Sequence, residues 1–329
     1  MLTQLEATTR KYHDKELKDC TKFRSYLGTK LMASAKEFAD GRSYTWPIKY
    51  ARLSMQWLAE YTKQERNPVE QITEAEEPYV FSSASVILSD QELLKNKGKQ
   101  RILNLLSKKL AMLKDDTAKG VIEQLWTGNT GLEPRGILAQ NAAGTATNNA
   151  WIDLTYATGS QSGTVATIVR GTNDTGAGSY TNWWQAQTTT SAGSITEAVL
   201  NDLIMDCTHD GDSPDTILAA RAVFQYIYNI ATGLEKENHS DLAKLGYKGI
   251  TINGLAVTWD DDLTAANADA LVCMRLPDWG LYFMKGSKMD RQPWFKPENQ
   301  RAYACDMYND FTFVCENPRN QGGLDGCTA

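Results

Sequence analysis

The feature that most constrains this chain is a long extended segment near the N-terminus, between residues 43 and 88. Over residues 43–58, aromatic and aliphatic side chains alternate with polar ones, which is the period of a half-buried β-strand. The alternation shifts by one residue near Ala51-Arg52, which indicates a β-bulge. Pro47 has no backbone N–H to donate, so we expect this strand to lie at the edge of a sheet.

A second extended stretch covers residues 79–88, and a polar, charged stretch at residues 60–77 separates it from the first. The pattern predicts a long two-stranded hairpin with a hydrated tip. A hairpin of two strands is marginal in water, so we expect this one to lie on something else. A charged tip suits contact with an oppositely charged patch of a neighbour. The residues predicted to make this contact between subunits are Trp46, Trp57, Lys63, Arg66, Glu70, Glu74, Glu76 and Glu77.

Residues 1–40 form a charged, helix-friendly segment that Asp40-Gly41 ends. Its apolar side chains are spaced for one helix face, and a segment of this kind cannot bury much surface alone. We therefore expect an arm that packs on something else, such as a neighbouring subunit. The residues of the apolar face are Phe23, Tyr26, Leu27, Leu31 and Met32.

A long amphipathic helix over residues 99–126 is the element that the pattern predicts most strongly. Ser89 and Glu92 form a capping box ahead of this apolar run, and Gly128 follows it within a series of turn residues. At 1.5 Å per residue such a helix is roughly seven turns long.

Residues 139–194 differ from the rest because only three of these 56 residues are charged, while Thr, Gly and Ser are frequent. This composition favours loops and short strands with a small-residue surface. We expect short strands at residues 151–156 and 164–169.

Ser194 and Glu197 form a second capping box, which predicts a helix beginning there. Asn253-Gly254 is a strong signal for a tight hairpin turn. The remaining predicted elements are a strand at 216–219, a helix at 220–230, a hairpin over 250–259 and a long closing strand at 303–315.

Composition excludes several classes of protein. With 329 residues, 42% of them hydrophobic and 22% charged, the chain is globular in composition. A net charge of −6 argues against a protein whose main work is to grip nucleic acid, because such proteins carry a basic face. We find no apolar run long enough to span a membrane and no signal peptide, so we expect no membrane partner and use in a cytoplasm. Six widely spaced cysteines indicate reduced, structural thiols.

Motifs for chemistry are mostly missing from the sequence. Gly171 and Gly176 have the glycine spacing of a phosphate-binding loop, but Ala177 stands where a lysine is required. Three carboxylates in a row, Asp260, Asp261 and Asp262, can hold Mg²⁺ or Ca²⁺, and they can equally be a hydrated loop at a strand end. The sequence therefore predicts no cofactor, no metal and no catalytic residue.

The order of parts is more informative than any motif, and it resembles the major capsid protein of tailed bacteriophages, with the Hong Kong 97-type capsid fold. Local sequence is similar in the same order along most of the chain from about residue 40. The similar segments are LWTGNTG at 125–131 with GIL at 136–138, NWW at 182–184 followed by the helix at 194–203, PDTIL at 214–218, LGYKG at 245–249, VTWDDD at 257–262 and NPRNQG at 317–322.

The resemblance implies an α+β fold with four parts. These are an N-terminal arm (1–40), an extended loop (41–88), a peripheral domain with a long spine helix (89–134 and 286–329) and an axial domain (135–285). It implies a structural protein, not an enzyme, whose copies form the hexamers and pentamers of an icosahedral shell around a double-stranded DNA genome.

Further partners that the resemblance implies are a separate scaffolding protein, a portal and a decoration protein. Contact with packaged DNA would be loose and non-specific, because an acidic wall repels DNA. The place of work would be the virion, after assembly in the host cytoplasm.

Three alternatives remain open from the sequence. An encapsulin-type nanocompartment shell has the same fold without a genome, so the contents of the particle distinguish it. A metal-dependent enzyme using Asp260, Asp261 and Asp262 would need a base, a nucleophile or a second ligand set nearby. A secreted or tail-fibre binding protein would account for the Thr-rich stretch, but the long capped helix and the missing signal peptide argue against it.

Overall fold

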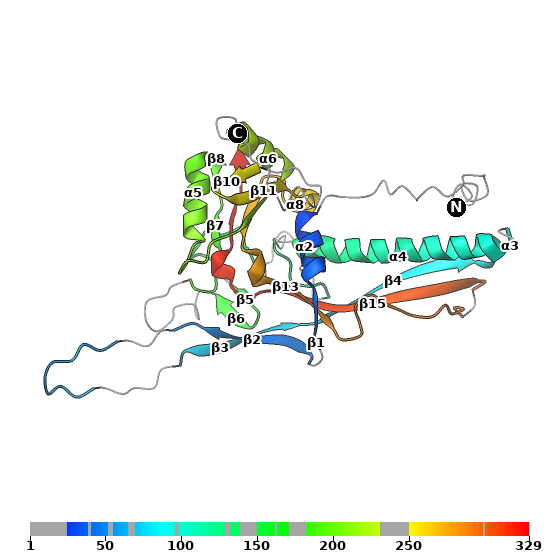
Figure 1. Cartoon of the computed structure of the whole chain (residues 1–329), viewed down its shortest axis with the longest axis horizontal. Helices are drawn as coiled ribbons and strands as arrows, with labels where there is room; N and C mark the ends of the chain where they lie inside the picture. Colours follow the sequence, from blue (N-terminus) through cyan, green and yellow to red (C-terminus); the bar gives the residue numbers. More distant parts are fainter. Residues whose placement is uncertain are drawn as a thin grey trace.

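Figure 1 shows an elongated molecule with a compact upper body, a long helix-and-strand extension to one side and a projecting hairpin on the other. The computed structural model describes residues 25–38, 41–51, 55–64, 70–95, 99–128, 132–138, 150–161, 163–170, 182–230, 250–298 and 300–328. Predictions about residues 1–24 and about Arg66 lie outside the described residues.

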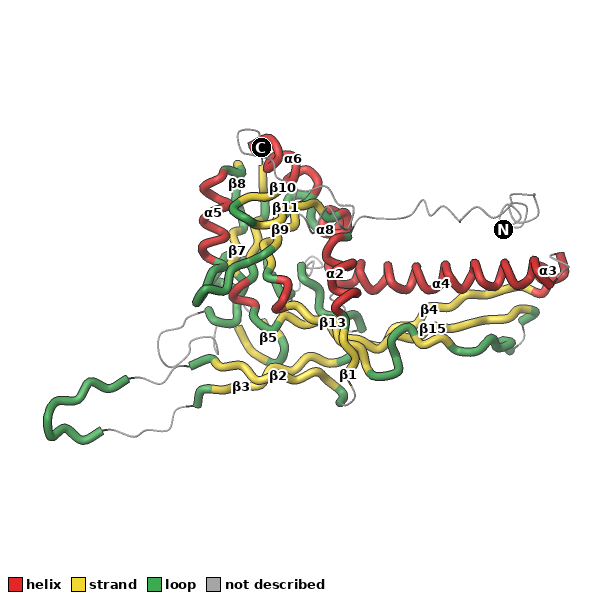
Figure 2. The backbone as a smooth tube through the Cα atoms, in the orientation of Figure 1, coloured by secondary structure: helices red, strands yellow, loops and turns green. Residues whose placement is uncertain are grey.

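The extension is built from the helix α4 (Lys99–Thr127) lying along the strands β4 (Val80–Ser89) and β15 (Ala302–Cys315), as Figure 2 shows. The predicted long helix and the predicted closing strand are both confirmed. The short helix α3 (Asp90–Lys95) precedes α4, and the hydroxyl of Ser89 accepts a hydrogen bond from the Glu92 N–H at 3.2 Å, which confirms the cap. Within the described side chains of α4, Leu113, Val121, Leu125 and Trp126 are buried, while Met112 is exposed.

The strand partner predicted for residues 79–88 was wrong. β4 pairs antiparallel with β15 over ten residues, from Ala302 opposite Ser89 to Phe311 opposite Val80, and not with the strand near residue 43. The closing strand offers β4 a partner of nearly its own length, and sequence periodicity carries no information about which strands pair. The sheet has the order β1 (Lys36–Phe38), β13 (Trp279–Met284), β15, β14 (Asp290–Arg291), with β4 on β15.

The upper body contains a six-stranded sheet with helices packed against it. Its strand order is β10 (Ile250–Ile252), β11 (Leu255–Trp259), β9 (Thr216–Ala219), β12 (Leu271–Met274), β16 (Gly322–Leu324) and β7 (Gln187–Thr189). The helices α5 (Glu197–Asp206) and α6 (Arg221–Ile230) bury their apolar faces in the same core. The remaining elements are α8 (Asp261–Ala266), the 3₁₀ turns η2 (Leu276–Asp278) and η3 (Pro318–Asn320), and the pair β8 (Gly193–Ser194) and β17 (Cys327–Thr328).

Several short-range predictions are confirmed in this body and two need correction. The hairpin turn at Asn253-Gly254 has φ of 49° and 81°, which is the left-handed region that this pair adopts readily. The cap of α5 is Thr196 and not Ser194, because the Thr196 hydroxyl accepts from the Val199 N–H at 3.3 Å. Residues 151–156 form no strand, and the strand expected at 164–169 is a small hairpin of β5 (Gly163–Val165) and β6 (Ile168–Arg170).

The described end of the N-terminal segment packs into its own chain. Helix α2 (Tyr26–Ser34) buries Tyr26, Leu27 and Leu31 in the central core, and β1 then adds to β13 as a parallel strand. A Cβ at Gly28 would lie 2.4 Å from the Ile122 side chain of α4, so a glycine is what allows the two helices to approach. The expectation that residues 1–40 pack on another molecule is therefore wrong for residues 25–38.

The projecting hairpin is formed by β2 (Ser43–Lys49) and β3 (Ile72–Pro78), which pair antiparallel over seven residues. The strand predicted to run to residue 58 ends at Lys49, and residues 55–64 have no regular structure. Residues 72–78, expected at a hydrated tip, are instead the second strand. The run Ile-Thr-Glu-Ala-Glu-Glu alternates with the period of a strand, but its three glutamates led to the prediction of a polar loop.

Candidate functional site

The base of the hairpin is where the projecting β2–β3 element joins the body. Trp46 lies opposite Ala75 in the ladder and is 7% exposed, so the hairpin contributes to the core at this point. Its ring centroid lies 6.5 Å from that of Trp151 and 6.4 Å from that of Trp184. Packed aromatic side chains of this size dominate core energetics, so these three rings fix the hairpin to the body.

Two further aromatic contacts hold the ends of β2. The ring of Tyr44 stacks on Tyr282 of β13 with centroids 4.1 Å apart, and Tyr50 stacks on Trp183 at 5.6 Å. The carboxylate of Glu316 accepts a hydrogen bond from the Tyr282 hydroxyl at 2.9 Å. Burial raises the pKa of both Tyr44 and Tyr282, and the Glu316 carboxylate nearby raises it further, so both hydroxyls stay protonated as donors.

A buried ion pair fixes β3. Glu77 is 5% exposed, and the Nε of Arg135 donates to both of its carboxylate oxygens at 3.1 Å. Arg135 also donates to the Thr164 carbonyl of β5 at 3.3 Å, and its guanidinium lies 5.7 Å from the ring centroid of Trp151. Burial raises the pKa of Glu77, although Arg135 acts in the opposite direction. The pair links the hairpin, the small β5–β6 hairpin and the segment after the spine helix.

The outer edge of β2 is shaped by Pro47. The N–H of Tyr50 donates to the Gln71 carbonyl at 3.0 Å, so even-numbered residues of β2 direct their N–H groups to β3. Pro47 has the other parity and therefore faces the edge that, within the described residues, pairs with no strand. Because proline has no N–H to offer, this edge is a poor template for another strand.

Beyond its base the hairpin exposes apolar side chains. Trp57 is 88% exposed and Tyr61 is 95% exposed, and Met55 and Leu58 are exposed as well. Isolated surface apolar residues are ordinary, but a gathering of four on one projecting segment marks an interaction surface.

The residues predicted for contact between subunits thus fall into distinct groups. Trp57, Lys63, Glu70 and Glu74 are exposed on the hairpin and available to a neighbour. Glu76 is exposed and bonded to Ser43 through the Ser43 hydroxyl. Trp46 and Glu77, by contrast, are buried within their own chain, so their ring and carboxylate serve the fold of the subunit.

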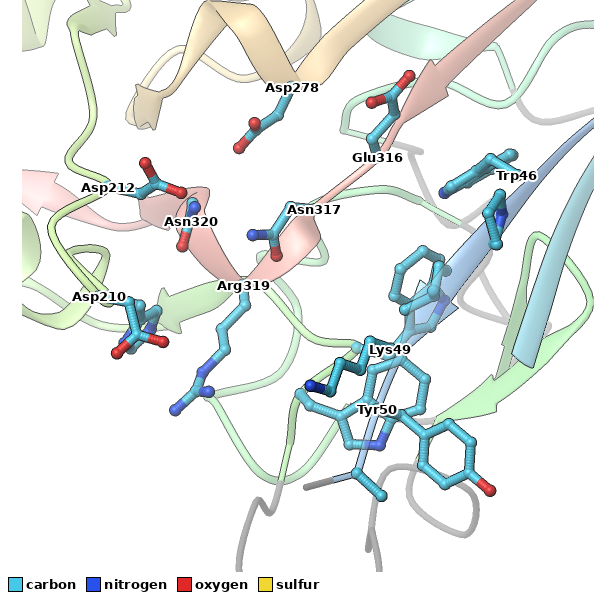
Figure 3. Close-up of a pocket in the computed structure, with 16 residues that line it drawn as sticks. Trp46, Lys49, Tyr50, Asp210, Asp212, Asp278, Glu316, Asn317, Arg319 and Asn320 are labelled. Carbon is cyan, nitrogen blue, oxygen red and sulfur yellow. The ribbon is translucent and has the colours of Figure 1, made fainter. Parts of the chain in front are cut away.

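Figure 3 shows the cavity of about 610 Å³ that lies between the base of β2 and the segment around η3. Its carboxylates already have partners: Arg275 binds Asp212 at 2.8 Å and also binds Asp278. The cavity belongs to the joint between the hairpin and the body. Burial and the nearby Arg319 lower the pKa of His209, which also lines it.

The acidic run at the end of β11 begins the helix α8. Asp260 is fully buried and caps α8, since its carboxylate accepts from the Asp262 and Leu263 N–H groups. Among the described residues, no group of three or more His, Cys, Asp or Glu side chains is arranged to hold a metal ion.

Two composition-based expectations can also be compared with the structure. The described cysteines are buried free thiols, namely Cys207, Cys273, Cys305, Cys315 and Cys327. In the part of the chain that the structure describes, no helix is both long enough and apolar enough to cross a membrane.

Sequence reasoning missed Arg135, Trp151 and Trp184, which are the partners that hold the hairpin. A basic residue beside Pro134, ahead of a nearly uncharged stretch, was the available signal for Arg135. The two tryptophans carried no positional signal, because their contacts with Trp46 join segments more than a hundred residues apart.

This architecture is similar to that of solved capsid structures. A solved structure described as the cyanophage A-1(L) capsid asymmetric unit matches with a TM-score of 0.63 and 13% identity, covering 96% of this chain and 97% of that one. The capsid of the native GTA particle matches with a TM-score of 0.55 and 14% identity, covering 98% of both chains. The predicted α+β, Hong Kong 97-type capsid fold is therefore confirmed.

A third capsid, that of Myoviridae phage XM1, matches with a TM-score of 0.50 and 13% identity, covering 97% of this chain and 98% of that chain. Protein-family models and curated protein sequences give no match. The likeness is thus one of fold and not of sequence.

Proposed function

We propose that this chain is the major capsid protein of a tailed bacteriophage and that its copies assemble into an icosahedral shell around double-stranded DNA. The support is the nearly full-length likeness of its fold to phage and GTA capsid subunits. The single observation that carries the proposal is the hairpin, which is fixed firmly at its base and exposes apolar residues beyond it.

Exposed aromatic side chains at the tip are energetically unfavourable for a subunit that stays monomeric in water. Burying an aromatic side chain of this kind stabilises an interface by about 2–3 kcal/mol. The strands at the base of the hairpin are already held by aromatic contacts, so they lose little conformational freedom when the hairpin meets a partner. We propose that Trp57, Lys63, Glu70 and Glu74, together with Arg66, contact a neighbouring copy, with the hairpin lying over that copy.

The charge of the chain fits a container for DNA. A net charge of −6 gives no general attraction for phosphates, so packed DNA can slide along the wall and leave. The role is structural and not catalytic. The expected partners are further copies in hexamers and pentamers, a scaffolding protein, a portal and a decoration protein. The expected locations are the host cytoplasm during assembly and the virion afterwards.

Electron microscopy of the protein, expressed with and without a scaffolding protein, tests the proposal. We expect closed icosahedral shells with the hairpin of one copy over another. A protein that remains monomeric at high concentration under both conditions would contradict it. Double-stranded DNA inside particles from infected cells supports the phage capsid, whereas shells that enclose protein cargo would indicate an encapsulin.

A further inference from the structure

Asp260 is a fully buried carboxyl that joins the beginnings of two helices 234 residues apart in the sequence. Its Oδ1 accepts from the N–H groups of Asp262 and Leu263 at 3.0 and 3.3 Å, at the start of α8. Its Oδ2 accepts from the Ser25 hydroxyl and from the Tyr26 N–H, both at 3.1 Å, at the start of α2. One carboxyl therefore holds α2 against the body.

The cap of α2 depends on this contact. Ser25 donates its hydroxyl proton to Asp260 and accepts at the same oxygen from the Gly28 N–H at 3.2 Å. Residues 1–24 continue directly from Ser25, so α2 is the link between that segment and the body. Any change in the Asp260 carboxyl therefore changes how strongly α2 is held to the body.

The surroundings of Asp260 disfavour a negative charge. Asp261 and Asp262 follow it on α8, and Glu123 of α4 faces Asp262. The β9 neighbour contributes only the Ala219 carbonyl, which accepts from the Asp260 N–H at 3.1 Å. Lys30 of α2 lies over the ring of Tyr26, and no described basic side chain lies within ion-pair distance of Asp260. A buried carboxylate without a cation is costly.

Four donors favour the ionised carboxyl, while burial and the neighbouring acids favour the neutral one. Burial is the larger effect: it raises the pKa of Asp260 to about 7, with Asp262 adding to the rise and the donors from Leu263, Asp262 and Ser25 opposing it. The carboxyl is thus balanced between its two forms near neutral pH.

We propose that Asp260 makes the docking of helix α2 onto the body dependent on pH, with α2 held more firmly when this carboxyl is protonated. In the released state the carboxyl is hydrated and ionises at an ordinary acidic pH, so docking takes up a proton. Docking therefore weakens as pH rises toward 7 and stays constant above about pH 8. The inference concerns the subunit itself and does not rest on shell formation.

Hydrogen exchange of the full-length subunit between pH 5 and 8.5, corrected for the intrinsic pH dependence of exchange, tests this proposal. We expect the protection of α2 amides to fall by roughly tenfold per pH unit between pH 5 and 7 and then to level off. The helix α5, which makes no contact with Asp260, is the internal control and should show no such change. A protection of α2 that stays constant across this range would overturn the proposal.

Variants separate Asp260 from other buried carboxyls. Asp260→Asn cannot ionise, so its α2 protection should be lower than in the wild type at pH 5 and independent of pH. Asp278→Asn removes another buried carboxyl of raised pKa, which binds Arg275 and Gln321, and should leave the wild-type profile intact. A pH dependence that survives in Asp260→Asn would also overturn the proposal. If Asp260→Asn does not fold, the comparison of α2 with α5 in the wild type decides.

Discussion

Tyr44 of the hairpin lies flat on Tyr282 of the central sheet, with the two ring planes 16° apart and the centroids at 4.1 Å. The pair lies where the projecting element leaves the body, and Phe38 of β1 packs edge-on against both rings. Two neighbouring strands, β1 and β2, thus meet the sequence-distant β13 at one aromatic cluster. The direction of the hairpin is set here, before any neighbour is present.

Removing the Tyr44 ring should loosen the hairpin at this end. Tyr44→Ala should lower the free energy of unfolding by about 2–4 kcal/mol, because a packed aromatic ring is lost. Tyr44→Phe keeps the stacking and should cost only about 1 kcal/mol, since it loses the hydroxyl's long 3.4 Å bond to Glu316 and its contact with the Tyr282 hydroxyl. Urea denaturation measures both. Equal losses in the two variants would mean that the hydroxyl and not the ring holds the hairpin.

The Glu77–Arg135 pair should be costly to break from one side. Arg135→Ala leaves a buried carboxylate without its cation and should lower stability by about 3–5 kcal/mol at pH 7. Exposed Glu74 on the same strand gives the matched control, because Glu74→Ala should change stability by less than about 0.5 kcal/mol. Chemical denaturation of the isolated subunit measures both, and similar losses would contradict a structural role for the pair.

The same pair predicts a pH dependence of stability. Burial raises the pKa of Glu77 above its unfolded value, so the native state binds the proton more tightly. The contribution of Glu77 to stability is therefore complete below its unfolded pKa and decreases as pH rises through the raised value. Denaturation curves from pH 4 to 8 should show a larger decrease in stability for the wild type than for Glu77→Gln. A wild-type curve parallel to that of the variant would show that the raised pKa has no effect on folding.

The aromatic side chains of the tip should affect assembly but not the stability of the folded subunit. Trp57→Ser combined with Tyr61→Ser removes two highly exposed rings, so the free energy of unfolding should change by less than about 0.5 kcal/mol. Loss of their burial between copies should raise the concentration needed for assembly at least tenfold, since about 1.4 kcal/mol corresponds to a factor of ten. Light scattering and electron microscopy measure assembly. Shells that form at the wild-type concentration would place the contact elsewhere.

Substituting alanine for two helical glycines should have opposite effects on stability, because only Gly28 lies where α2 and α4 approach each other closely. Gly28→Ala places a Cβ 2.4 Å from Ile122 and should destabilise the subunit by about 1–3 kcal/mol. Gly120→Ala, in the middle of α4, meets no atom within 4 Å and should stabilise the chain by up to about 1 kcal/mol. Thermal unfolding of both variants tests the pair, and a stabilising Gly28→Ala would mean that the helices are not in contact.

Local patterns in the sequence correctly predicted those helices and turns that are determined by residues close together in the chain. The 3.6-residue period, the Ser89 cap and the Asn253-Gly254 turn placed the spine helix and one hairpin correctly, because each is decided within a few residues. The pairing of strands could not be predicted in this way. The partner of β4 lies more than two hundred residues away, and only the burial of both strands against α4 selects it.

The candidate site shows the same division. Trp57 of the tip was picked out from the sequence, because its side chain stands out at the end of the alternating run, whereas the equally exposed Tyr61 was not predicted. The role of Glu77 could not be predicted, since its neighbours Glu74 and Glu76 look identical and only the position of Arg135 distinguishes it. Asp260 was misjudged for a similar reason, because its capping partners Ser25 and Tyr26 come from the opposite end of the chain.

Pro47 has a consequence for how copies recognise one another. The outer edge of β2 lacks one N–H at Pro47, so another strand cannot pair along it with a complete set of hydrogen bonds. Backbone pairing of that kind does not depend on which side chains are present. In the proposed shell, contacts through the β2 edge should therefore depend mainly on side chains. The specificity of one copy for another is thereby encoded residue by residue, so single substitutions can retune it without changing the fold.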